Sequence, residues 1–196
     1  MRHALPVRID STSDGSPADP GLSSLGVEQA ARLVEALAGD AVDVVYSSPA
    51  RRARETAAAF VAARGLEPLI EEGLAEFDAA HSSYVPVEEL RAAGDPRWER
   101  LVAGDLYHPE VDPEAFQQRA VEALEAVAAR HPGGRAVLFT HSGVINAYTA
   151  QLTGQPRMLW FAPAYASVSR IGAARDGRRG IVSLNETGHV RDLLTQ

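Results

Sequence analysis

Two histidines and an arginine lie at the predicted ends of strands and helices, where their side chains could form a reactive site. His3 follows Arg2 near the start of the chain, His141 follows an apolar run, and Arg52 lies at the start of a helical segment. A neutral imidazole can attack phosphorus as a nucleophile, and the planar guanidinium of Arg matches two phosphate oxygens at once. These residue types together indicate a cationic pocket and phosphoryl transfer through a phosphohistidine.

The elements between these residues must bring them to one place. Helical periodicity and capping residues predict helices at about 24–38, 50–64, 113–130 and 143–152. Short β-rich runs predict strands at 42–46, 66–70, 135–140, 166–171 and 180–184. This alternation favours an α/β fold, a three-layer α/β/α sandwich with a mostly parallel sheet. Ligands of such sheets bind beyond the carboxyl ends of the strands, so we expect Arg2, His3, Arg52 and His141 to meet there.

Composition narrows the chemistry further. The chain has 196 residues, no cysteine and 19 basic residues, all of which are Arg. Disulfides, thiolate nucleophiles, zinc-cysteine sites, a P-loop lysine and a lysine Schiff base are therefore excluded. The net charge of −7 argues against a nucleic-acid partner, because a nucleic-acid binder needs a broad basic face. Any anion that this protein binds must be held by a local cluster.

Length and hydropathy indicate one compact unit. We expect a single domain over residues 1–196, with a loop-rich, substrate-covering excursion at about 71–109 that contains one or two short helices. No apolar run reaches the roughly 20 residues that span a bilayer, so no membrane partner and a cytoplasmic location are expected. The sequence leaves open whether the chain forms a homodimer.

The sequence resembles the histidine phosphatase superfamily (phosphoglycerate mutase-like, branch 1) over nearly its whole length. Each matching segment is weak alone, but six occur in the family's order. They are Arg2-His3-Ala4, Leu22–Ala30, Ser48–Ala57, Leu74-Ala75-Glu76, His141–Val144 and Asn185–His189. The resemblance implies the phosphoglycerate mutase-like fold and a phosphatase activity that needs no metal or other cofactor.

The resemblance also implies a role for each site residue. His3 is the phosphoryl acceptor, and Arg2, Arg52 and His141 hold the phosphate oxygens. Glu76 protonates the leaving group and then activates water. Two physical requirements follow: the second ring nitrogen of His3 should donate to a backbone carbonyl, and the pKa of Glu76 should be raised.

The chain departs from the family pattern at three places. The family has a central strand before Arg-His, whereas here Met1 corresponds to the last residue of that strand, so we expect the first central strand to be truncated. Ala4 and Ser142 replace glycines of the two histidine motifs. The segment Ala80–Tyr84 replaces the family's usual Gly-x-Trp-Glu-Gly, which predicts a different substrate wall.

Several assignments have alternatives. Glu71, Glu72 and Asp78 compete with Glu76 for the role of the acid, and Glu76 itself could be a solvated carboxylate. A second set of residues could form a substrate wall or pack on the surface of the excursion; it consists of His81, Tyr84, Trp98, Tyr107 and His108. His189 is interpreted as structural.

The function that these residues favour is hydrolysis of a phosphomonoester of a small metabolite. A catalytically weak phosphate-binding or scaffolding module is the first alternative, because the first strand and the acid segment are altered. A phosphoglycerate mutase is the second alternative. The sequence does not indicate the alcohol part of the substrate.

Overall fold

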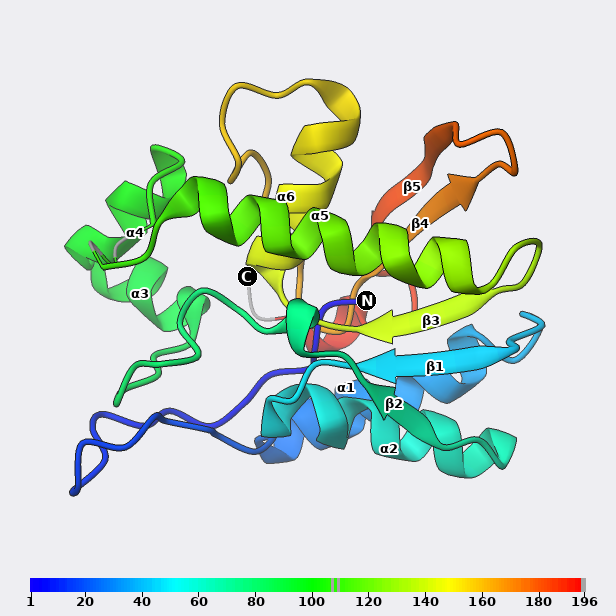
Figure 1. The fold of residues 1–196 in the computed structure, drawn as a ribbon. Helices are drawn as coiled ribbons and strands as arrows, with labels where there is room; N and C mark the ends of the chain where they lie inside the picture. Colours follow the sequence, from blue (N-terminus) through cyan, green and yellow to red (C-terminus); the bar gives the residue numbers. More distant parts are fainter. Residues whose placement is uncertain (107, 109, 195–196) are drawn as a thin grey trace.

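The computed structural model describes residues 1–106, 108 and 110–194 (Figure 1). Three parallel strands form its central sheet in the order β2-β1-β3: β1 (Val44–Ser47), β2 (Pro68–Ile70) and β3 (Ala136–Phe139). In the register of β1 and β3, Ser47 lies opposite Phe139. Both strands therefore end at the same level, and the residues that follow them emerge side by side.

Helices cover both faces of this sheet, as the three-layer prediction required (Figure 1). One face carries α1 (Ser24–Ala36) and α2 (Arg51–Arg64), and the other carries α5 (Pro113–Arg130) and α6 (Ser142–Thr153). The predicted start of α5 is confirmed, since the Asp112 side chain accepts from two backbone N–H groups of the first turn and a proline follows it.

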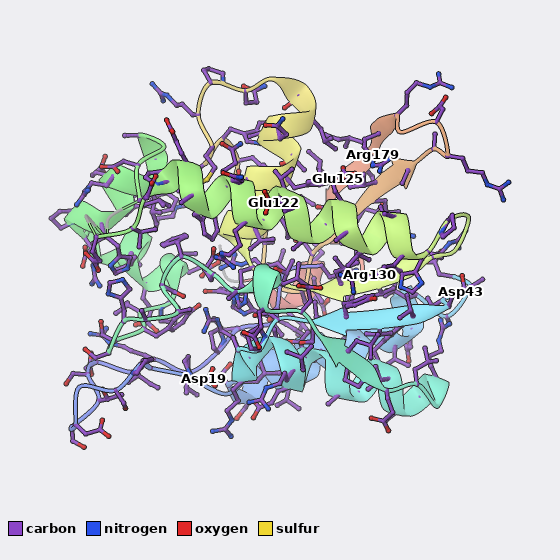
Figure 2. All side chains as sticks on the ribbon, viewed as in Figure 1. Asp19, Asp43, Glu122, Glu125, Arg130 and Arg179 are labelled. Carbon is purple, nitrogen blue, oxygen red and sulfur yellow. The ribbon has the colours of Figure 1, made fainter. Side chains whose placement is uncertain are left out.

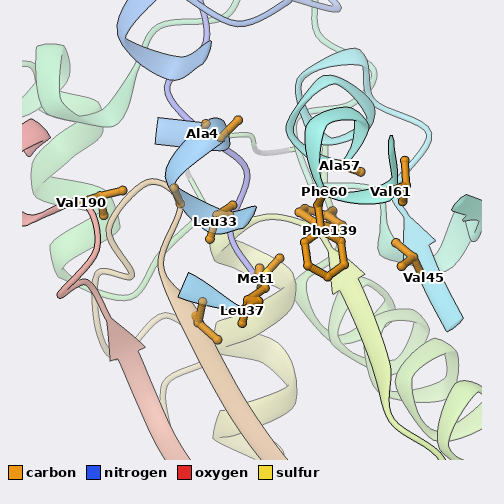
Figure 3. Close-up of a cluster of buried hydrophobic side chains, with 13 residues drawn as sticks. Met1, Ala4, Leu33, Leu37, Val45, Ala57, Phe60, Val61, Phe139 and Val190 are labelled. Carbon is orange, nitrogen blue, oxygen red and sulfur yellow. The ribbon is translucent and has the colours of Figure 1, made fainter. Parts of the chain in front are cut away.

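The alternation of side chains along β1 divides the core in two. Val45 points into a cluster under α1 and α2, where the rings of Phe60 and Phe139 lie 5.9 Å apart (Figure 3). The neighbouring Tyr46 points to the opposite cluster, which is formed largely by α5 and α6. Successive side chains of a strand face opposite sides, so one short apolar strand supports both helical layers.

The first three residues are fixed between the two sheets. The His3 N–H donates to the Thr140 carbonyl at 2.8 Å, and the Thr140 N–H donates to the Met1 carbonyl at 2.8 Å. On the other side, the Arg2 N–H donates to the Ser167 carbonyl at 3.1 Å. The expected remnant of a central strand is thus a short extended segment beside the end of β3, and its hydrogen bonds hold His3 in place.

The last two strands form a separate antiparallel hairpin of β4 (Val168–Ala173) and β5 (Arg179–Glu186). An ion pair between α5 and β5 ties this hairpin to the helical layer, with Glu125 Oε2 2.6 Å from Arg179 Nη2 (Figure 2). Both side chains are partly exposed to solvent, so salt screens this pair.

The excursion after β2 contains two short helices, α3 (Val87–Ala93) and α4 (Pro96–Val102), besides the 3-10 turn η1 (Glu72–Leu74). Figure 1 shows α3 and α4 beyond the carboxyl ends of β1 and β3, where the site was expected. A second 3-10 turn, η2 (Arg191–Leu193), lies near the end of the chain. Among the described residues, no helix has both the length and the apolar character to cross a membrane.

Candidate active site

His3 presents one ring nitrogen to the site and uses the other for anchoring. Its Nδ1 lies 2.8 Å from the Ala4 carbonyl oxygen, so the ring N–H donates there and Nε2 keeps its lone pair. This bond confirms the predicted tautomer. Burial, together with the charges of Arg52 and Arg2, holds the pKa of His3 well below its usual value. The ring is therefore neutral at physiological pH, as a nucleophile must be.

His141 lies at the N-terminal end of α6, and its ring centroid is 5.0 Å from that of His3. Its Nε2 lies 2.7 Å from the Ser48 hydroxyl, which comes directly after β1. Its Nδ1 is buried without a hydrogen-bond partner among the described residues. The parallel pairing of β1 with β3 brings Ser48 and His141 together, because both follow a strand end.

Two buried arginines approach the histidines from different elements. Arg2 donates to the Pro163 carbonyl at 2.6 Å, and its guanidinium carbon lies 3.5 Å from the centre of the Tyr165 ring. Arg52, in the first turn of α2, donates to Asp78 Oδ1 at 2.9 Å. Both side chains are almost fully buried.

Three buried nitrogens of this cluster have no partner among the described residues: the guanidinium donors Arg2 Nε and Arg52 Nε, and the ring nitrogen His141 Nδ1. Buried polar groups in proteins are almost always hydrogen-bonded, so unpaired donors that converge need an acceptor. A tetrahedral anion offers several acceptor oxygens and compensates the two buried positive charges. The arrangement is therefore suited to a phosphoryl group.

Glu76 is held by two backbone N–H groups, from Gly143 to Oε2 at 2.7 Å and from Phe77 to Oε1 at 3.1 Å. Burial and the neighbouring charge of Asp78 raise the pKa of Glu76 to about 7, against the lowering effect of those hydrogen bonds and of Arg52. This meets the second physical requirement for a proton donor. A carboxyl group with that pKa can be protonated or ionised near neutral pH, so it can act as acid and then as base.

The structure separates the four candidate acids. Glu76 and Asp78 line the pocket, and Asp78 is engaged by Arg52. Glu71 instead pairs with Arg130 at 2.7 Å, and Glu72 is exposed. Of the four, Glu76 is the carboxyl group that is buried, lines the pocket and has a raised pKa.

The predicted residues converge on one pocket of about 280 Å³, which Arg2, His3, Arg52 and Glu76 line. His141 stands beside it through its contact with the His3 ring. Of the predicted substrate wall, Tyr84 and Trp98 line the pocket, while His81 and His108 lie outside it. Tyr107 lies outside the described residues.

Four further residues support the site. The sequence analysis placed Ser48 in a family segment and weighed Asp78 as an alternative acid, but it did not predict their contacts with His141 and Arg52. Glu88, whose Oε1 lies 3.6 Å from Arg2 Nη1, and Tyr165 come from distant segments. No local pattern marks either of them.

One cluster outside the pocket has the donor types of a metal site: His81, His108 and Glu110. Glu110 Oε1 lies 2.9 Å from His81 Nε2 and 3.7 Å from His108 Nδ1. However, the two imidazoles are stacked, with centroids 3.4 Å apart and planes at 24°. The lone pair of an imidazole nitrogen lies in the plane of its ring. Two stacked, nearly parallel rings therefore cannot both direct a lone pair at one ion. This geometry favours a stacked pair beside a carboxylate over a metal centre.

His189 takes the structural position expected of it. Its Nε2 lies 3.0 Å from the carbonyl of Ala166, a residue with a positive φ of 56°. The Ala166 N–H in turn donates to the His3 carbonyl at 3.1 Å. His189 therefore supports the backbone behind His3 and does not face the pocket.

Comparison with known proteins places this geometry in a family. The family model "Histidine phosphatase superfamily (branch 1)" matches residues 1–187. Phosphoserine phosphatase 1 of Hydrogenobacter thermophilus is 30% identical over 189 residues, which cover 91% of this chain and 86% of that protein.

Solved structures share the fold over almost the whole chain. Bacillus stearothermophilus YhfR aligns with a TM-score of 0.75 at 25% identity and covers 97% of this chain and 96% of its own. An Entamoeba histolytica phosphoserine phosphatase in complex with phosphoserine aligns with a TM-score of 0.72 at 19% identity, covering 96% of both chains. A mycobacterial glucosyl-3-phosphoglycerate phosphatase also has a TM-score of 0.72, at 23% identity and with coverage of 94% and 95%. The predicted fold is confirmed, and the chain belongs to branch 1 of the histidine phosphatase superfamily.

Proposed function

We propose that this protein hydrolyses phosphomonoesters in two steps, with His3 Nε2 as the phosphoryl acceptor. The observation that carries the proposal is the tautomer of His3, whose Nδ1 donates to the Ala4 carbonyl while Nε2 has no hydrogen-bond partner among the described residues. That nitrogen lies in a pocket where buried cationic donors lack partners. A neutral nucleophile among cations is the arrangement that attack on an anionic phosphate needs.

In the first step, the His3 Nε2 lone pair forms a bond to phosphorus, and the ester P–O bond breaks. The leaving oxygen takes the proton of Glu76, so that an alcohol departs instead of an alkoxide. Arg2, Arg52 and His141 donate to the remaining phosphoryl oxygens and neutralise their charge. Positioning and charge neutralisation supply most of the catalysis in such a transfer.

In the second step, the Glu76 carboxylate takes a proton from water, and the water oxygen attacks phosphorus. The P–N bond breaks, its electron pair returns to His3 Nε2, and inorganic phosphate leaves. Glu76 is protonated again and ready for another cycle. Nothing in either step calls for a metal ion, since two arginines carry the opposing charge.

The raised pKa of Glu76 supports hydrolysis over passive phosphate binding. A buried carboxyl beside the anion site weakens anion binding when it is ionised, so a binding module gains nothing from it. In a hydrolase the same group is the acid and base. We further propose that residues 1–196 act as a single domain on a small molecule, without nucleic acid, because the net charge is −7 and a nucleic-acid binder needs a broad basic face.

The test is turnover of p-nitrophenyl phosphate in EDTA by wild type, His3→Gln and the control His131→Gln. His131 contacts Tyr46 on a different part of the fold, with 2.9 Å between Nε2 and the hydroxyl. We expect His3→Gln to lose at least about 10³-fold in kcat, while His131→Gln stays active. Rapid quench of the wild type in alkaline denaturant, in which the P–N bond survives, should trap a phosphorylated His3 in the peptide mass spectrum. Full activity of His3→Gln would contradict the mechanism, and 2- to 3-phosphoglycerate interconversion would indicate a mutase.

A further inference from the structure

The pocket changes character with distance from His3. Its charged groups gather at one end, around His3. The rest of the wall is largely apolar and comes mainly from α3, α4 and the segment before Tyr165; it includes Val87, Leu90, Trp98, Leu101, Trp160 and Pro163. Its polar members are Tyr84, Ser142 and Asn146. A phosphoryl group at His3 would therefore direct its alcohol part against an apolar surface.

Positive charge is confined to the phosphate end. Among the described residues that line the pocket, the basic ones are Arg2, His3 and Arg52. Arg52 is already paired with Asp78, and Arg2 lies 3.6 Å from Glu88. A second anionic group on the substrate would have no further cation to pair with. Burying an unpaired carboxylate is strongly unfavourable, so the pocket disfavours it.

The amide at the edge of the apolar wall is also committed. The Asn146 side-chain nitrogen donates to the Ser142 and Phe161 carbonyls, both at 3.0 Å. Its Oδ1 accepts from the backbone N–H groups of Trp160 and Phe161 at 3.0 and 3.1 Å. Asn146 therefore fixes the segment that carries Trp160, and it has little capacity left for a polar substrate group.

We infer that the pocket selects phosphomonoesters whose alcohol part is uncharged and apolar, such as alkyl or aryl phosphates, over esters that carry a carboxylate. The inference rests on the proposed phosphatase function. It separates this chain from the phosphoserine and glucosyl-3-phosphoglycerate phosphatases to which it is similar, since both of those esters carry a carboxylate. The specificity residues are then those that α3 and α4 contribute to the wall, and α4 contributes Trp98, Leu101 and Val102.

A homologous series tests the inference without changing the leaving-group chemistry. The probes are ethyl, butyl and hexyl phosphate, compared with O-phospho-L-serine and 3-phosphoglycerate under identical conditions. We expect kcat/KM to rise along the alkyl series by up to roughly fourfold per buried methylene, until the pocket is filled. Phosphoserine and 3-phosphoglycerate should not exceed ethyl phosphate.

A wall substitution then assigns the preference to this surface. Helix α4 has no fully buried residue, so Leu101→Asn should fold, and it should reduce the hexyl-to-ethyl ratio several-fold. The control Val27→Asn changes a 58% exposed residue of α1 and should keep the wild-type ratio. If Leu101→Asn does not fold, Val102→Asn, at a 57% exposed lining position, gives the same comparison.

The outcomes distinguish the two proposals. A flat alkyl series, equal ratios for Leu101→Asn and Val27→Asn, or phosphoserine hydrolysed faster than hexyl phosphate would overturn the apolar-pocket inference. If ester hydrolysis in any of these cases were still lost in His3→Gln, the proposed function would stand. Folded wild-type protein that hydrolyses none of the five esters would overturn both.

Discussion

Gly143 and Glu76 are packed so closely that a side chain at position 143 would force the Glu76 carboxylate to move. The Gly143 N–H donates to Glu76 Oε2 at 2.7 Å, and a Cβ added at Gly143 would overlap Oε1 of the same carboxylate. It would also lie 2.9 Å from Phe77 Cδ1. The first turn of α6 thus places the proposed acid, and the absence of a side chain at one helical position makes this possible.

Gly143→Ala should therefore displace the Glu76 carboxyl and lower kcat/KM for an alkyl phosphate. A misplacement of about 1 Å in a catalytic group costs on the order of 10²-fold. The matched control is Gly39→Ala, at a position where an added Cβ meets nothing within 4 Å. Steady-state kinetics of both variants make the comparison, and equal activities would show that the close contact is not important for catalysis.

The pH profile should reveal Glu76 as the acid. Because the pKa of Glu76 is raised to about 7, its protonated fraction falls above that pH, and kcat/KM for an alkyl phosphate should fall with it. The pKa of His3 is lowered well below its usual value, so His3 stays neutral and its own acid limb lies below the ordinary histidine range.

Glu76→Gln should remove the alkaline limb and lower the alkyl phosphate rate by about 10² to 10⁴-fold. The loss should be smaller for p-nitrophenyl phosphate, whose leaving group departs without a proton. The measurement is kcat/KM against pH for both substrates. An alkaline limb that persists unchanged in Glu76→Gln would assign it to another group.

Stability should depend on the same carboxyl. A group whose pKa is higher in the folded than in the unfolded protein binds protons more tightly when folded, so its contribution to stability is lost as pH rises. For Glu76, the window runs from the ordinary glutamate pKa of 4.5 to the raised pKa of about 7. The free energy of unfolding of wild type should therefore fall relative to Glu76→Gln by about 3 kcal/mol across this window. Denaturant titrations at pH 5 and pH 8 measure the difference, and a pH-independent difference would contradict the raised pKa.

How far the sequence could predict this site depends on how local each signal was. The caps and apolar periods around Ser23, Asp112 and His141 are local, and they place α1, α5 and α6 within one or two residues of where they occur. The strand-end rule then brings His3, Arg52 and His141 together. No comparable local signal was available for Glu88 and Tyr165, which contact Arg2.

The unpredicted part consists of contacts between distant segments. Tyr165 stacks under Arg2 from more than 160 residues away along the chain, and Glu88 approaches Arg2 from α3. Helix α3 has seven residues, and only one of them is buried. Its apolar pattern is therefore too short to predict which face of the helix packs against the protein. Such contacts follow from the packing of the excursion over the sheet edge, which one sequence does not encode in a readable pattern.

Asp78 should adjust both the acid and the phosphate site. It accepts from Arg52 at 2.9 Å, and its charge contributes to the raised pKa of Glu76. Asp78→Asn should shift the alkaline limb of kcat/KM to lower pH. It should also tighten inhibition by inorganic phosphate by about tenfold, because Arg52 loses its opposing charge. The control Asp176→Asn alters an exposed carboxylate of the β4–β5 turn. In this variant the pH of the alkaline limb and the inhibition constant of phosphate should both keep their wild-type values.

Adjacent arginines at the start of α2 provide the sharpest test of the phosphate site. Arg52 is buried in the pocket, whereas the Arg51 side chain is 58% exposed and pairs with Glu55. Neighbouring helical positions point about 100° apart, so one of the two residues can reach the anion while the other remains in solvent.

Inorganic phosphate should stabilise the wild type through this site. At a concentration of 100 Kd it adds about 2.7 kcal/mol, which raises Tm by roughly 5 to 10 °C in a chain of this size. Arg51→Met should keep that shift, and Arg52→Met should lose most of it, because the buried donor facing the anion is gone. Differential scanning calorimetry with and without phosphate makes the comparison. Equal shifts in the two variants would place the anion away from Arg52, and with it the phosphoryl group that His3 is proposed to accept.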